Sequence, residues 1–446
     1  MTSQLELSFD PSGLFKKVTQ AHAEADVIFL SSKTLNFKVS KGNLEAYKVN
    51  ATSRIGIRVI HNERVGIAYS ESFDTQSLSL MVDQALENAA ISKKDSHQIL
   101  PNKSILFKGE SPSAWYQPEV ASESELLEQL KALESQVLSH KYVKSCPHNG
   151  LTTSQTGCRI WSSHGLDVQS LTSTSSAFIY ALAEANGHNS MEGGRSCGRT
   201  FADLDLNKLA QEVQTEAIQL LDGAPVTTGT YDVILSADCL AQLFQVFSMI
   251  FSGKSALDGL NPWRNRLAQS VAFSELTIID KPSLPSLGQA VFDSEGVACQ
   301  DTVIVQEGIL KTLLHNTATA QELNINTTGN GSRSTKSPLS VEPHQLCLAR
   351  GMTTVSSLQA GQYLEITSLT GTHSGANSVS CDFSFGAAGY LCRNGVRQQP
   401  VRGITLAANF YELLHKIAIG DDHRWDSDQQ FLAPSVRLQG VCVAGS

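Results

Sequence analysis

Histidine spacing decides whether this chain can hold a local metal site for hydrolysis. A zinc peptidase usually places two ligands at a fixed separation on one helix face, with a glutamate base beside them. The chain has 12 histidines, of which none is followed by glutamate and no two are four or five residues apart. The nearest pairs are eight residues apart, His140 with His148 and His415 with His423. On a helix that is a rise of about 12 Å, so we expect hydrogen-bonded histidines rather than ligands.

Other catalytic motifs are incomplete. Ser384 lies in Asp-Phe-Ser-Phe-Gly, which lacks the first glycine of a G-x-S-x-G nucleophile elbow. The sequence has no G-x-x-x-x-G-K-[ST] phosphate loop. Two carboxylate pairs are candidates for acid–base chemistry, although a loop or a helix cap is the favoured interpretation of each: Asp421 with Asp422, and Asp293 with Glu295.

Cysteine usage and charge exclude several classes of protein. The nine cysteines are an odd number and none stands in C-x-x-C spacing. A disulfide framework or a zinc ribbon would show pairs, so we expect reduced thiols used as small apolar residues. The formal charge is 34 − 43 = −9, without a run of five basic residues. This balance argues against nucleic acid or an anionic membrane as the main partner.

The sequence predicts a soluble, cytoplasmic protein. Met1–Asp10 has no basic region followed by an apolar core, as a signal peptide would. The longest wholly apolar run is Ala177–Ala183, whereas a membrane-spanning helix needs about 20 such residues.

The N-terminal half, residues 1–225, is predicted to repeat a unit of helix, strand meander and helix. The first unit, about 1–95, opens with a helix near Ser12–Ala25 and closes with a helix capped by Asp74 or Thr75. The second, about 118–225, has helices near Glu123–His140 and Asn207–Leu221. Strands are predicted at Val27–Ser31, Leu35–Ser40, Leu44–Asn50, Arg54–Ile60 and Val65–Ser70, then at Gly157–Ser162, Leu166–Ser170 and Ala177–Ala183.

Residues 230–446 are predicted to form one β-rich domain. Its first strand, Tyr231–Leu235, leads into a helix at Asp238–Phe251, and a late helix is expected at Asn409–Ile419. Glu307-Gly308 and Asn394-Gly395 indicate hairpins. The predicted fold class is α+β, with a duplicated helix–antiparallel meander–helix half and a β-rich C-terminal domain.

A series of short motifs runs in a fixed order through nearly the whole chain. The motifs are Gly56-Ile-Arg-Val-Ile60, Gly259-Leu-Asn-Pro-Trp-Arg264, Phe292-Asp-Ser-Glu-Gly-Val297, Val305-Gln-Glu-Gly-Ile-Leu-Lys311, His315-Asn-Thr-Ala-Thr-Ala320, Thr328-Gly-Asn-Gly331, Gly403-Ile-Thr-Leu406, Ala408-Asn-Phe-Tyr-Glu-Leu-Leu414 and Ile419-Gly-Asp-Asp422. In this order they resemble the TldD/PmbA family, also called modulators of DNA gyrase.

The resemblance implies one of two kinds of chain. The TldD kind carries His-Glu-x-x-x-His on the helix after the first strand of the C-terminal domain, with a cysteine near the C-terminus as a further zinc ligand. The PmbA (TldE) kind lacks the motif and pairs with the first kind as a heterodimer. The pair is implied to cut short or unfolded peptides and to remove leader segments from peptide precursors.

This chain resembles the PmbA kind. Aligned on the strand at Asp232-Val-Ile-Leu235, the motif positions fall near Gln245, Val246 and Ile250, and Ala241–Phe251 contains no His, Glu or Asp. Cys442 lies in a strand-like setting rather than a glycine-rich loop, so we do not expect it to bind zinc. The resemblance therefore implies no metal in this chain and a zinc ion in its partner.

Three functions stay open. In the first, the chain is a non-catalytic subunit that completes a peptide-binding chamber, with polar loop residues as candidate peptide contacts: Asn261, Arg264, Asn316, Asn330, Arg333 and His373. In the second, it is a self-sufficient metallopeptidase with non-local ligands, such as His315, His373 and Asp293. In the third, it is a binding protein that modulates DNA gyrase. The expected partners are a TldD-like paralogue and short peptides, and a homodimer of the isolated chain stays open.

Overall fold

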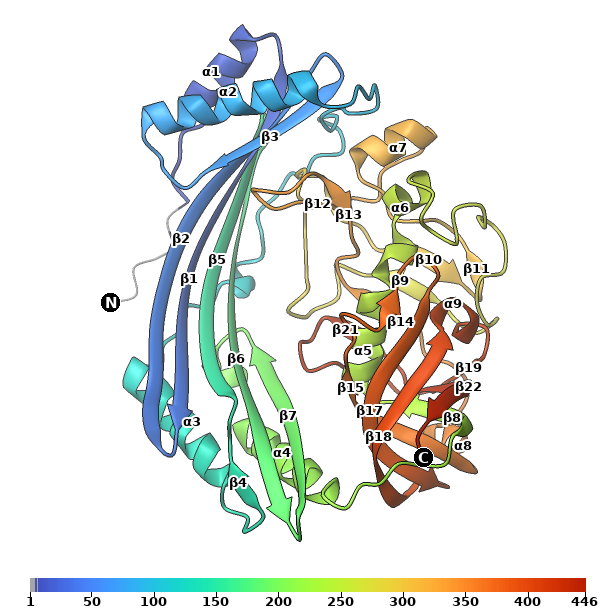
Figure 1. The fold of residues 1–446 in the computed structure, drawn as a ribbon. Helices are drawn as coiled ribbons and strands as arrows, with labels where there is room; N and C mark the ends of the chain where they lie inside the picture. The colour runs from blue at the N-terminus through green and yellow to red at the C-terminus, as the bar shows by residue number, and fades with distance from the viewer. Residues whose placement is uncertain (1–4, 6) are drawn as a thin grey trace.

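The computed structural model describes residues 5 and 7–446, and its N-terminal and C-terminal halves stand side by side (Figure 1). Residues 1–4 and 6, part of the stretch predicted not to be a signal peptide, lie outside the described residues. The N-terminal half combines four long helices with long antiparallel strands. The C-terminal half consists mainly of strands, and its helices are short. The fold is therefore α+β, as predicted. None of the helices in the described part of the chain has the length and apolar character needed to span a lipid bilayer.

The N-terminal half consists of two units with the same order of elements. Each has a helix, three long strands that pair in sequence order, and a second helix. The first unit has α1 (Ser12–Gln20), β1 (Glu24–Ser40), β2 (Asn43–His61), β3 (Arg64–Ser70) and α2 (Thr75–Ile91). The second has α3 (Glu123–Val137), β4 (Val143–Ser145), β5 (Asn149–Ser162), β6 (Asp167–Ala185), β7 (His188–Gly198) and α4 (Leu206–Gln219), with short 3-10 turns at η1 (Ser113–Trp115) and η2 (Phe201–Asp203).

One sheet joins the two units. Its order is β3-β2-β1-β5-β6, and both β7 and β4 pair with β6. Strand β1 of the first unit lies antiparallel to β5 of the second, from the pair Asp26 and Ser162 to the pair Phe37 and Leu151. The sheet is continuous across this junction, so the units share one scaffold.

The strands are longer than the sequence predicted. The predicted strands leave out Ser-Lys-Thr at 32–34 and Ala-Thr-Ser at 51–53, but β1 and β2 run through both segments. The hydroxyl groups pair across the strands instead: Ser32 Oγ lies 3.0 Å from Thr52 Oγ1, and Thr34 Oγ1 lies 3.2 Å from Ser154 Oγ. Serine and threonine without glycine or proline do not stop a strand when their hydroxyls can pair across it.

All four long helices of this half lie on the same face of the sheet. Alternate side chains of β1 point to one face. At one end of that face Val27 and Phe29 pack with residues of α1 and α2, and at the other end Phe37 and Val39 pack with residues of α3 and α4. The section of this face between the two helix pairs has no helix over it (Figure 1). The helix starts were predicted well: Asp74 caps α2, and Ser122 forms a capping box with Glu125.

The C-terminal half has two large sheets around one apolar core, and a separate two-stranded sheet. One sheet has the order β15-β8-β22-β18-β17-β16 and the other β11-β10-β9-β14-β21-β20. The strands are β8 (Gly229–Leu235), β9 (Ile278–Asp280), β10 (Thr302–Gln306), β11 (Ile309–Leu310), β12 (Gly331–Ser332), β13 (Ser340–Val341), β14 (Leu346–Leu348), β15 (Gln362–Thr370), β16 (Ala376–Asn377), β17 (Asp382–Arg393), β18 (Val396–Asn409), β19 (Ile417–Ile419), β20 (Arg424–Trp425), β21 (Phe431–Ala433) and β22 (Val436–Ala444). The helices are α5 (Ala237–Val246), η3 (Ser248–Phe251), α6 (Gly253–Leu257), α7 (Thr317–Leu323), α8 (Val355–Leu358) and α9 (Phe410–Leu413).

Two predicted hairpins and one predicted helix of this half can be compared with the structure. The turns at Glu307-Gly308 and Asn394-Gly395 connect β10 to β11 and β17 to β18, as expected. The late helix predicted at Asn409–Ile419 is wrong in length, because only α9 is helical and Ile417–Ile419 pairs with β22 as β19. Pairing with β22 provides hydrogen bonds for the backbone groups of Ile417–Ile419. This long-range pairing is a tertiary contact that local sequence does not specify.

A buried ionic network joins the sheet to the C-terminal half. Arg58 on β2 donates from Nε to Asp26 Oδ2 at 2.8 Å and from Nη2 to Glu295 Oε1 at 3.1 Å. Arg333 donates from Nη2 to Asp26 Oδ1. The side chains of Asp26, Arg58 and Arg333 are each 1% exposed and that of Glu295 is fully buried. Two positive and two negative charges thus compensate one another where the two halves meet.

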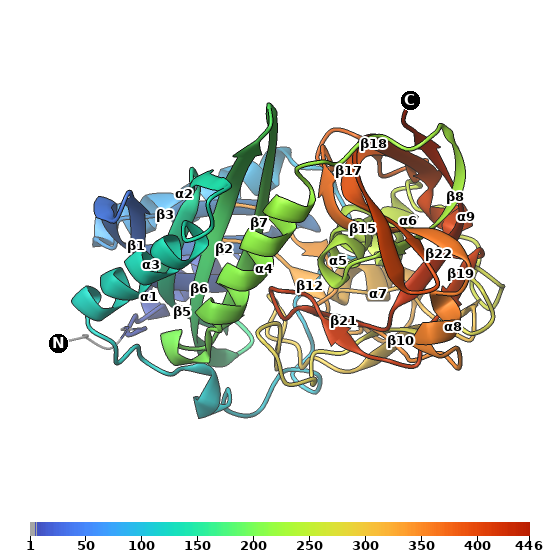
Figure 2. The same ribbon diagram turned by 90° about the horizontal axis from the view of Figure 1, so that it is seen from below.

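A second contact between the halves lies at the other end of the sheet. Seen from below, α4 is on the side of the N-terminal half that faces the C-terminal half (Figure 2). Gln219 at the end of α4 accepts a hydrogen bond from Tyr390 Oη at 3.0 Å, and Glu216 Oε2 lies 3.4 Å from Arg397 Nη1. Beside them, burial and the Glu216 carboxylate raise the pKa of Glu192 to about 7.

We expect Asp26→Asn to lower the free energy of unfolding by about 3–5 kcal/mol, because it leaves two buried guanidinium groups with a single carboxylate. Chemical denaturation followed by circular dichroism measures this loss. Glu71→Gln is the matched control, since Glu71 pairs with Lys336 at 3.2 Å across the same junction but is exposed. The control should change stability far less than Asp26→Asn does, because solvent screens an exposed pair. A loss for Asp26→Asn as small as that of the control would contradict the role given to the network.

The raised pKa of Glu192 predicts a pH-dependent stability. As pH rises from about 4.5 to about 7, the unfolded chain releases this proton while the folded chain keeps it. The unfolded state is thereby favoured, so stability falls across this window and the loss persists above it. Glu192→Gln should remove this pH-dependent loss of stability. The difference in melting temperature between the variant and the wild type should therefore be more positive at pH 8 than at pH 5. The exposed Glu184→Gln on the same hairpin should show equal differences at both pH values. The prediction fails if the melting-temperature difference for Glu192→Gln is also equal at the two pH values.

Candidate functional site

Helix α5 occupies the position where the TldD-type motif is expected. Ser236 caps it by accepting the Cys239 backbone N–H at 3.2 Å. The three motif positions face different surroundings: Gln245 is exposed, Val246 is half-buried, and Ile250 in η3 is fully buried in the core. Two ligands of one zinc ion must face the same space. The residues at these positions therefore do not fit a zinc ion, both in chemistry and in direction.

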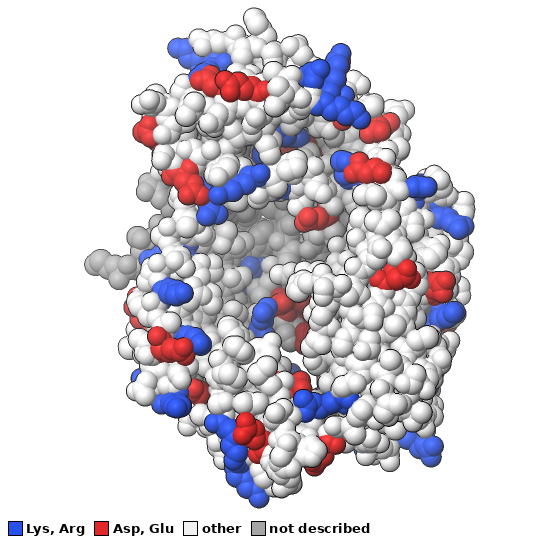
Figure 3. All heavy atoms as spheres, in the orientation of Figure 1, with Lys and Arg blue, Asp and Glu red and all other residues white. Residues whose placement is uncertain are grey.

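A polar cleft of about 440 Å³ opens over the exposed side of α5. Its floor is Ala241, Gln245 and Ser248, and its walls come from segments 342–346 and 426–431. Figure 3 shows that the molecule is hollowed between its two halves, with charges of both signs mixed over the surface in view. We take the cleft over α5 as the candidate functional site, because the degenerate motif helix forms its floor.

Carboxylates line one wall of the cleft but already have partners. Asp426 Oδ1 accepts the backbone N–H groups of Gln430 and Phe431, each at 2.8 Å, and burial raises the pKa of Asp426. Asp428 Oδ1 lies 2.6 Å from Nη1 of Arg195 on β7. Strand β7 of the N-terminal half therefore contacts this wall, whereas the residues that line the cleft all belong to the C-terminal half.

His344 stands on the opposite wall and was not singled out by the sequence. Its Nε2 lies 2.7 Å from the carbonyl oxygen of Gly329. A carbonyl only accepts, so Nε2 carries a proton, and the neutral ring has its lone pair on Nδ1. Cys299 Sγ lies 3.2 Å from the same Nε2, and burial together with Asp293 and Asp280 raises the pKa of this thiol. Cys299 thus stays a protonated thiol, and the pair does not form an activated nucleophile.

The carboxylate pair Asp293 and Glu295 serves the scaffold. Asp293 accepts the backbone N–H groups of Glu295 at 2.9 Å, Val297 at 3.0 Å and Gly331 at 2.7 Å. Glu295 Oε2 accepts the Thr317 N–H at 2.9 Å, while Oε1 belongs to the network with Arg58. Burial and the neighbouring Glu295 raise the pKa of Asp293 to about 8. Asp422, of the other candidate pair, accepts both the N–H and the O–H of Ser435 at 2.7 Å.

Four of the six predicted peptide contacts are buried. Asn261 donates to the carbonyl oxygens of Ile250 at 2.9 Å and Ser252 at 3.1 Å. Asn316 caps α7 by accepting the Thr319 N–H at 2.9 Å. Asn330 donates to Asp280 Oδ2 at 2.6 Å. With Arg333 in the ionic network, the structure assigns these four residues to the scaffold.

The remaining two predicted contacts, Arg264 and His373, are exposed. Arg264 donates to the carbonyl oxygen of Gly259 in its own loop. The structure does not gather the six residues into one surface. The glycine-rich loops that drew attention to the buried four are places where polar side chains organise the backbone, which a sequence does not distinguish from a binding loop.

The non-local ligands considered for a self-sufficient peptidase do not converge. His315 is buried, with Nδ1 3.2 Å from Thr319 Oγ1, and burial lowers its pKa to about 4. His373 is exposed, whereas Asp293 is buried and bonded to the backbone N–H groups of Glu295, Val297 and Gly331. Within residue 5 and residues 7–446, no group of three or more His, Cys, Asp or Glu side chains is placed to hold a metal ion. Cys442 lies on β22, opposite Thr230 and Ala407.

Three family models match this chain in succession. The model of PmbA/TldA metallopeptidase domain 1 matches residues 25–89, that of the central domain matches 116–221, and that of the C-terminal domain matches 228–445. With the fold described above, these matches place the protein in a class of three-domain chains of a metallopeptidase family. The chain belongs to the PmbA/TldD family.

Relatives and solved structures agree with this assignment. Metalloprotease PmbA of Escherichia coli O157:H7 is 26% identical over 422 residues, which cover 93% of this chain and 91% of the relative. A candidate modulator of a DNA gyrase from Thermotoga maritima has a TM-score of 0.86 at 25% identity, covering 97% of this chain and 99% of that chain. TldE from Thermococcus kodakarensis has a TM-score of 0.85 at 18% identity, covering 97% and 99%, which shows the same fold.

The geometry of α5 predicts that introducing the residues of the His-Glu-x-x-x-His motif at positions 245, 246 and 250 will not create a metal site. In the variant Gln245→His, Val246→Glu and Ile250→His, the third substitution places an imidazole in the apolar core rather than in the cleft. We expect no stoichiometric zinc by elemental analysis after chelator treatment. Ile250→His alone should lower the melting temperature, because it buries a polar ring without a partner, whereas Gln245→His alone should not. One retained zinc ion per chain would contradict this account of the helix.

Proposed function

We propose that this chain is the non-catalytic subunit of a zinc peptidase pair that cuts short or unfolded peptides. Hydrolysis at neutral pH needs an activated water and a stabilised oxyanion, which a zinc ion with a carboxylate base supplies. The observation that carries the proposal is the motif helix: Ile250 is fully buried and Val246 offers no base. A TldD-like partner bearing His-Glu-x-x-x-His would provide the zinc, and this chain would complete the chamber.

The inner face of the sheet supports the part of the proposal that concerns peptides. Side chains at even positions of β1 point to the same face as Asp26, which contacts the C-terminal half. Beyond Asp26 the middle of this face carries hydroxyls and amides, namely Ser32, Thr34 and Asn36 on β1 and Thr152 and Ser154 on β5, while Lys48 of β2 lies opposite Asn36 on the same face. Asn36 Oδ1, for example, accepts from Thr152 Oγ1 at 2.8 Å. The hydroxyls and amides of this wall can form hydrogen bonds with peptides of varied sequence.

The cysteines support a reducing compartment such as the cytoplasm as the place where the pair would work. All nine are free thiols in the structure. Disulfides are rare in the cytosol and common in secreted proteins. Direct DNA contact has no comparable support, because the net charge is −9 and Figure 3 shows no segregated basic patch on the face in view.

The proposal predicts that neither this chain alone nor a mixture with an inactivated partner will cut peptides. An unstructured fluorogenic peptide should be hydrolysed only when this chain is mixed with a motif-bearing paralogue, and the two should co-elute. The interface should be of the obligate kind, about 2,000 Å² or more. Substituting the first histidine of the partner's motif should abolish activity.

Two results would overturn the proposal. One is chelator-sensitive hydrolysis by this chain alone, which would favour a self-sufficient peptidase. The other is full activity of the paralogue in the absence of this chain. A matched control is the mixture with Glu128→Gln, which should stay active because Glu128 is an exposed residue of α3 outside the cleft over α5.

A further inference from the structure

The inner face of the N-terminal sheet changes from polar to apolar on β6 and β7. Side chains at even positions of β6 belong to this face, because Ser176 pairs with Thr152 of the polar wall. Tyr180 is 39% exposed and Met191 is 46% exposed, which is unusual for large apolar side chains in the middle of a sheet. Beyond Ser176 the face carries four apolar side chains, which we call the Tyr180 patch: Phe178, Tyr180 and Leu182 on β6, and Met191 on β7 opposite Leu182.

Two glycines give the aromatic rings of the patch their places on the sheet. Gly193 lies directly opposite Tyr180, and Gly150 lies directly opposite Phe178. A Cβ atom at Gly193 would come within 2.4 Å of the Tyr180 ring, and one at Gly150 within 2.7 Å of the Phe178 ring. His148 packs edge-on against Tyr180, with ring centroids 6.0 Å apart. The rings are therefore held in position before any ligand arrives, which lowers the entropy cost of binding.

Contacts with the C-terminal half flank the Tyr180 patch along β7. On one side of it, Arg402 donates from Nη1 to the carbonyl oxygen of Asn189. On the other side, Arg195 lies opposite Phe178 and contacts Asp428 on the wall of the cleft over α5. The patch therefore lies beside the candidate functional site and faces the hollow between the two halves (Figure 3).

The Tyr180 patch carries no net charge. The charged residues that share its face on β6 and β7 are Glu184 and Arg195, one of each sign, and Arg195 is already paired with Asp428. Such a surface binds by removing an apolar side chain from water. The thioether of Met191 adapts to side chains of different shape, as methionine does at binding surfaces that accept many partners.

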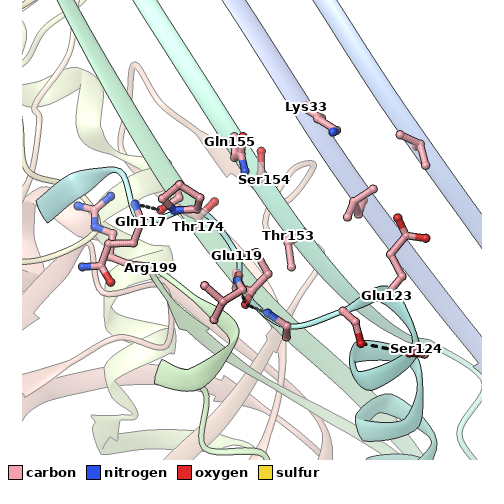
Figure 4. A pocket seen from close by; sticks show the side chains of 18 residues that line it. Lys33, Gln117, Glu119, Glu123, Ser124, Thr153, Ser154, Gln155, Thr174 and Arg199 are labelled. Carbon is pink, nitrogen blue, oxygen red and sulfur yellow. Dashed lines mark hydrogen bonds between the residues drawn. The ribbon is translucent and has the colours of Figure 1, made fainter. Parts of the chain in front are cut away.

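The opposite face of the same sheet carries a different cleft, of about 780 Å³, between the two helix pairs (Figure 4). Lys33 and Arg199 line it together with Glu119 and Glu123, so its charges are of both signs. Its strand residues, such as Lys33 and Gln155, pair with each other at odd positions and point away from the Tyr180 patch. The two surfaces are therefore separate.

The size of the Tyr180 patch favours a peptide side chain over a second subunit as its occupant. A stable protein interface uses about 20–30 residues from each side, whereas this patch has four and ends at the polar residues Ser176 and Asn189. Four apolar side chains are enough to cover one aromatic or long aliphatic side chain. Unfolded peptides expose such side chains, whereas folded proteins bury most of them.

We propose that the Tyr180 patch binds one aromatic or long aliphatic side chain of an unfolded peptide inside the chamber. The inference rests on the proposed function, and it names the class of peptide that the chamber prefers, which is one with an apolar side chain free to leave water. Tyr180 and Met191 contact the bound side chain, and Phe178 and Leu182 support them from the sheet.

The first test measures binding to the full chain alone, without a catalytic partner. Two fluorescein-labelled peptides share a Gly/Ser background and differ at one central position, which is phenylalanine in one and serine in the other. Fluorescence anisotropy should show that the phenylalanine peptide binds about fivefold to tenfold more tightly. High salt should leave this preference unchanged, because neither the patch nor the phenylalanine is charged.

Variants of the patch should reduce the preference for phenylalanine. Tyr180→Ser and Met191→Ser should each lower it to about twofold or less, whereas Tyr180→Phe should retain it. Met352→Ser is the matched control, since Met352 is 87% exposed in the loop before α8 and lies outside the patch. Met191→Ser keeps the test independent of folding if loss of the Tyr180 ring lowers the melting temperature.

Three outcomes would overturn the proposal. The first is equal affinity of the chain for the phenylalanine and serine peptides. The second is a preference that falls as much in Met352→Ser as in Met191→Ser. The third is a Met191→Ser variant that no longer co-elutes with the motif-bearing paralogue but keeps the peptide preference, which would assign the patch to a subunit contact.

The mixture with the paralogue separates failure of this inference from failure of the proposed function. If the mixture cuts neither peptide, the proposed function is wrong, while binding by the chain alone still decides the role of the patch. If the mixture cuts both peptides with the same kcat/KM, the patch is wrong and the proposed function stands. We expect kcat/KM to favour the phenylalanine peptide, and Met191→Ser to remove most of that preference.

Discussion

The buried network of Asp26, Arg58, Arg333 and Glu295 fixes how the two halves of the molecule meet. Four ionised groups stay out of water only because each finds an opposite charge from another segment, and Asp26 connects both arginines. Ionic groups of this kind tolerate little displacement, since removing one partner leaves an uncompensated buried charge. This is the buried ionic contact between the sheet and the C-terminal half, and the contacts of α4 and β7 with Tyr390, Arg397 and Asp428 are more exposed.

The polar residues of the structure fall into two groups. Some form hydrogen bonds that organise the backbone, and others have polar groups without a partner. Asn261, Asn330 and Asp293 spend their hydrogen-bonding groups on loops of the C-terminal half. Lys33 and the Nδ1 atom of His344 line clefts and have no hydrogen-bond partner among the described residues. The residues with free groups therefore point to binding more clearly than those that only occur in family-like motifs, because a satisfied buried group has nothing to offer a ligand.

The motif helix shows how this fold can be kept without zinc ligands at the motif positions. Its apolar residues, such as Phe244 and Phe247, pack against Phe410 with ring centroids 5.2 and 4.9 Å apart. These contacts hold the helix in place whether or not zinc ligands stand on its exposed side. The side chain of Ile250 points into the apolar core, whereas a zinc ligand at this position would have to point into the cleft. Loss of the ligands and retention of the fold are thus compatible, which is the condition for a subunit that works through a partner.

The sequence by itself determined the periodic and local features of this protein: the α+β class, the caps at Asp74 and Ser122, the Asn394-Gly395 hairpin and the absence of ligands on Ala241–Phe251. These depend on side-chain period, short-range hydrogen bonds and residue type, which are written along the chain. Only the tertiary structure decided that Arg58 and Arg333 share Asp26, that His344 faces the cleft over α5, and that Lys33 and Arg199 line one surface. Each of those facts joins segments far apart in sequence, and pairing over such distances is settled by packing and charge compensation in the folded state.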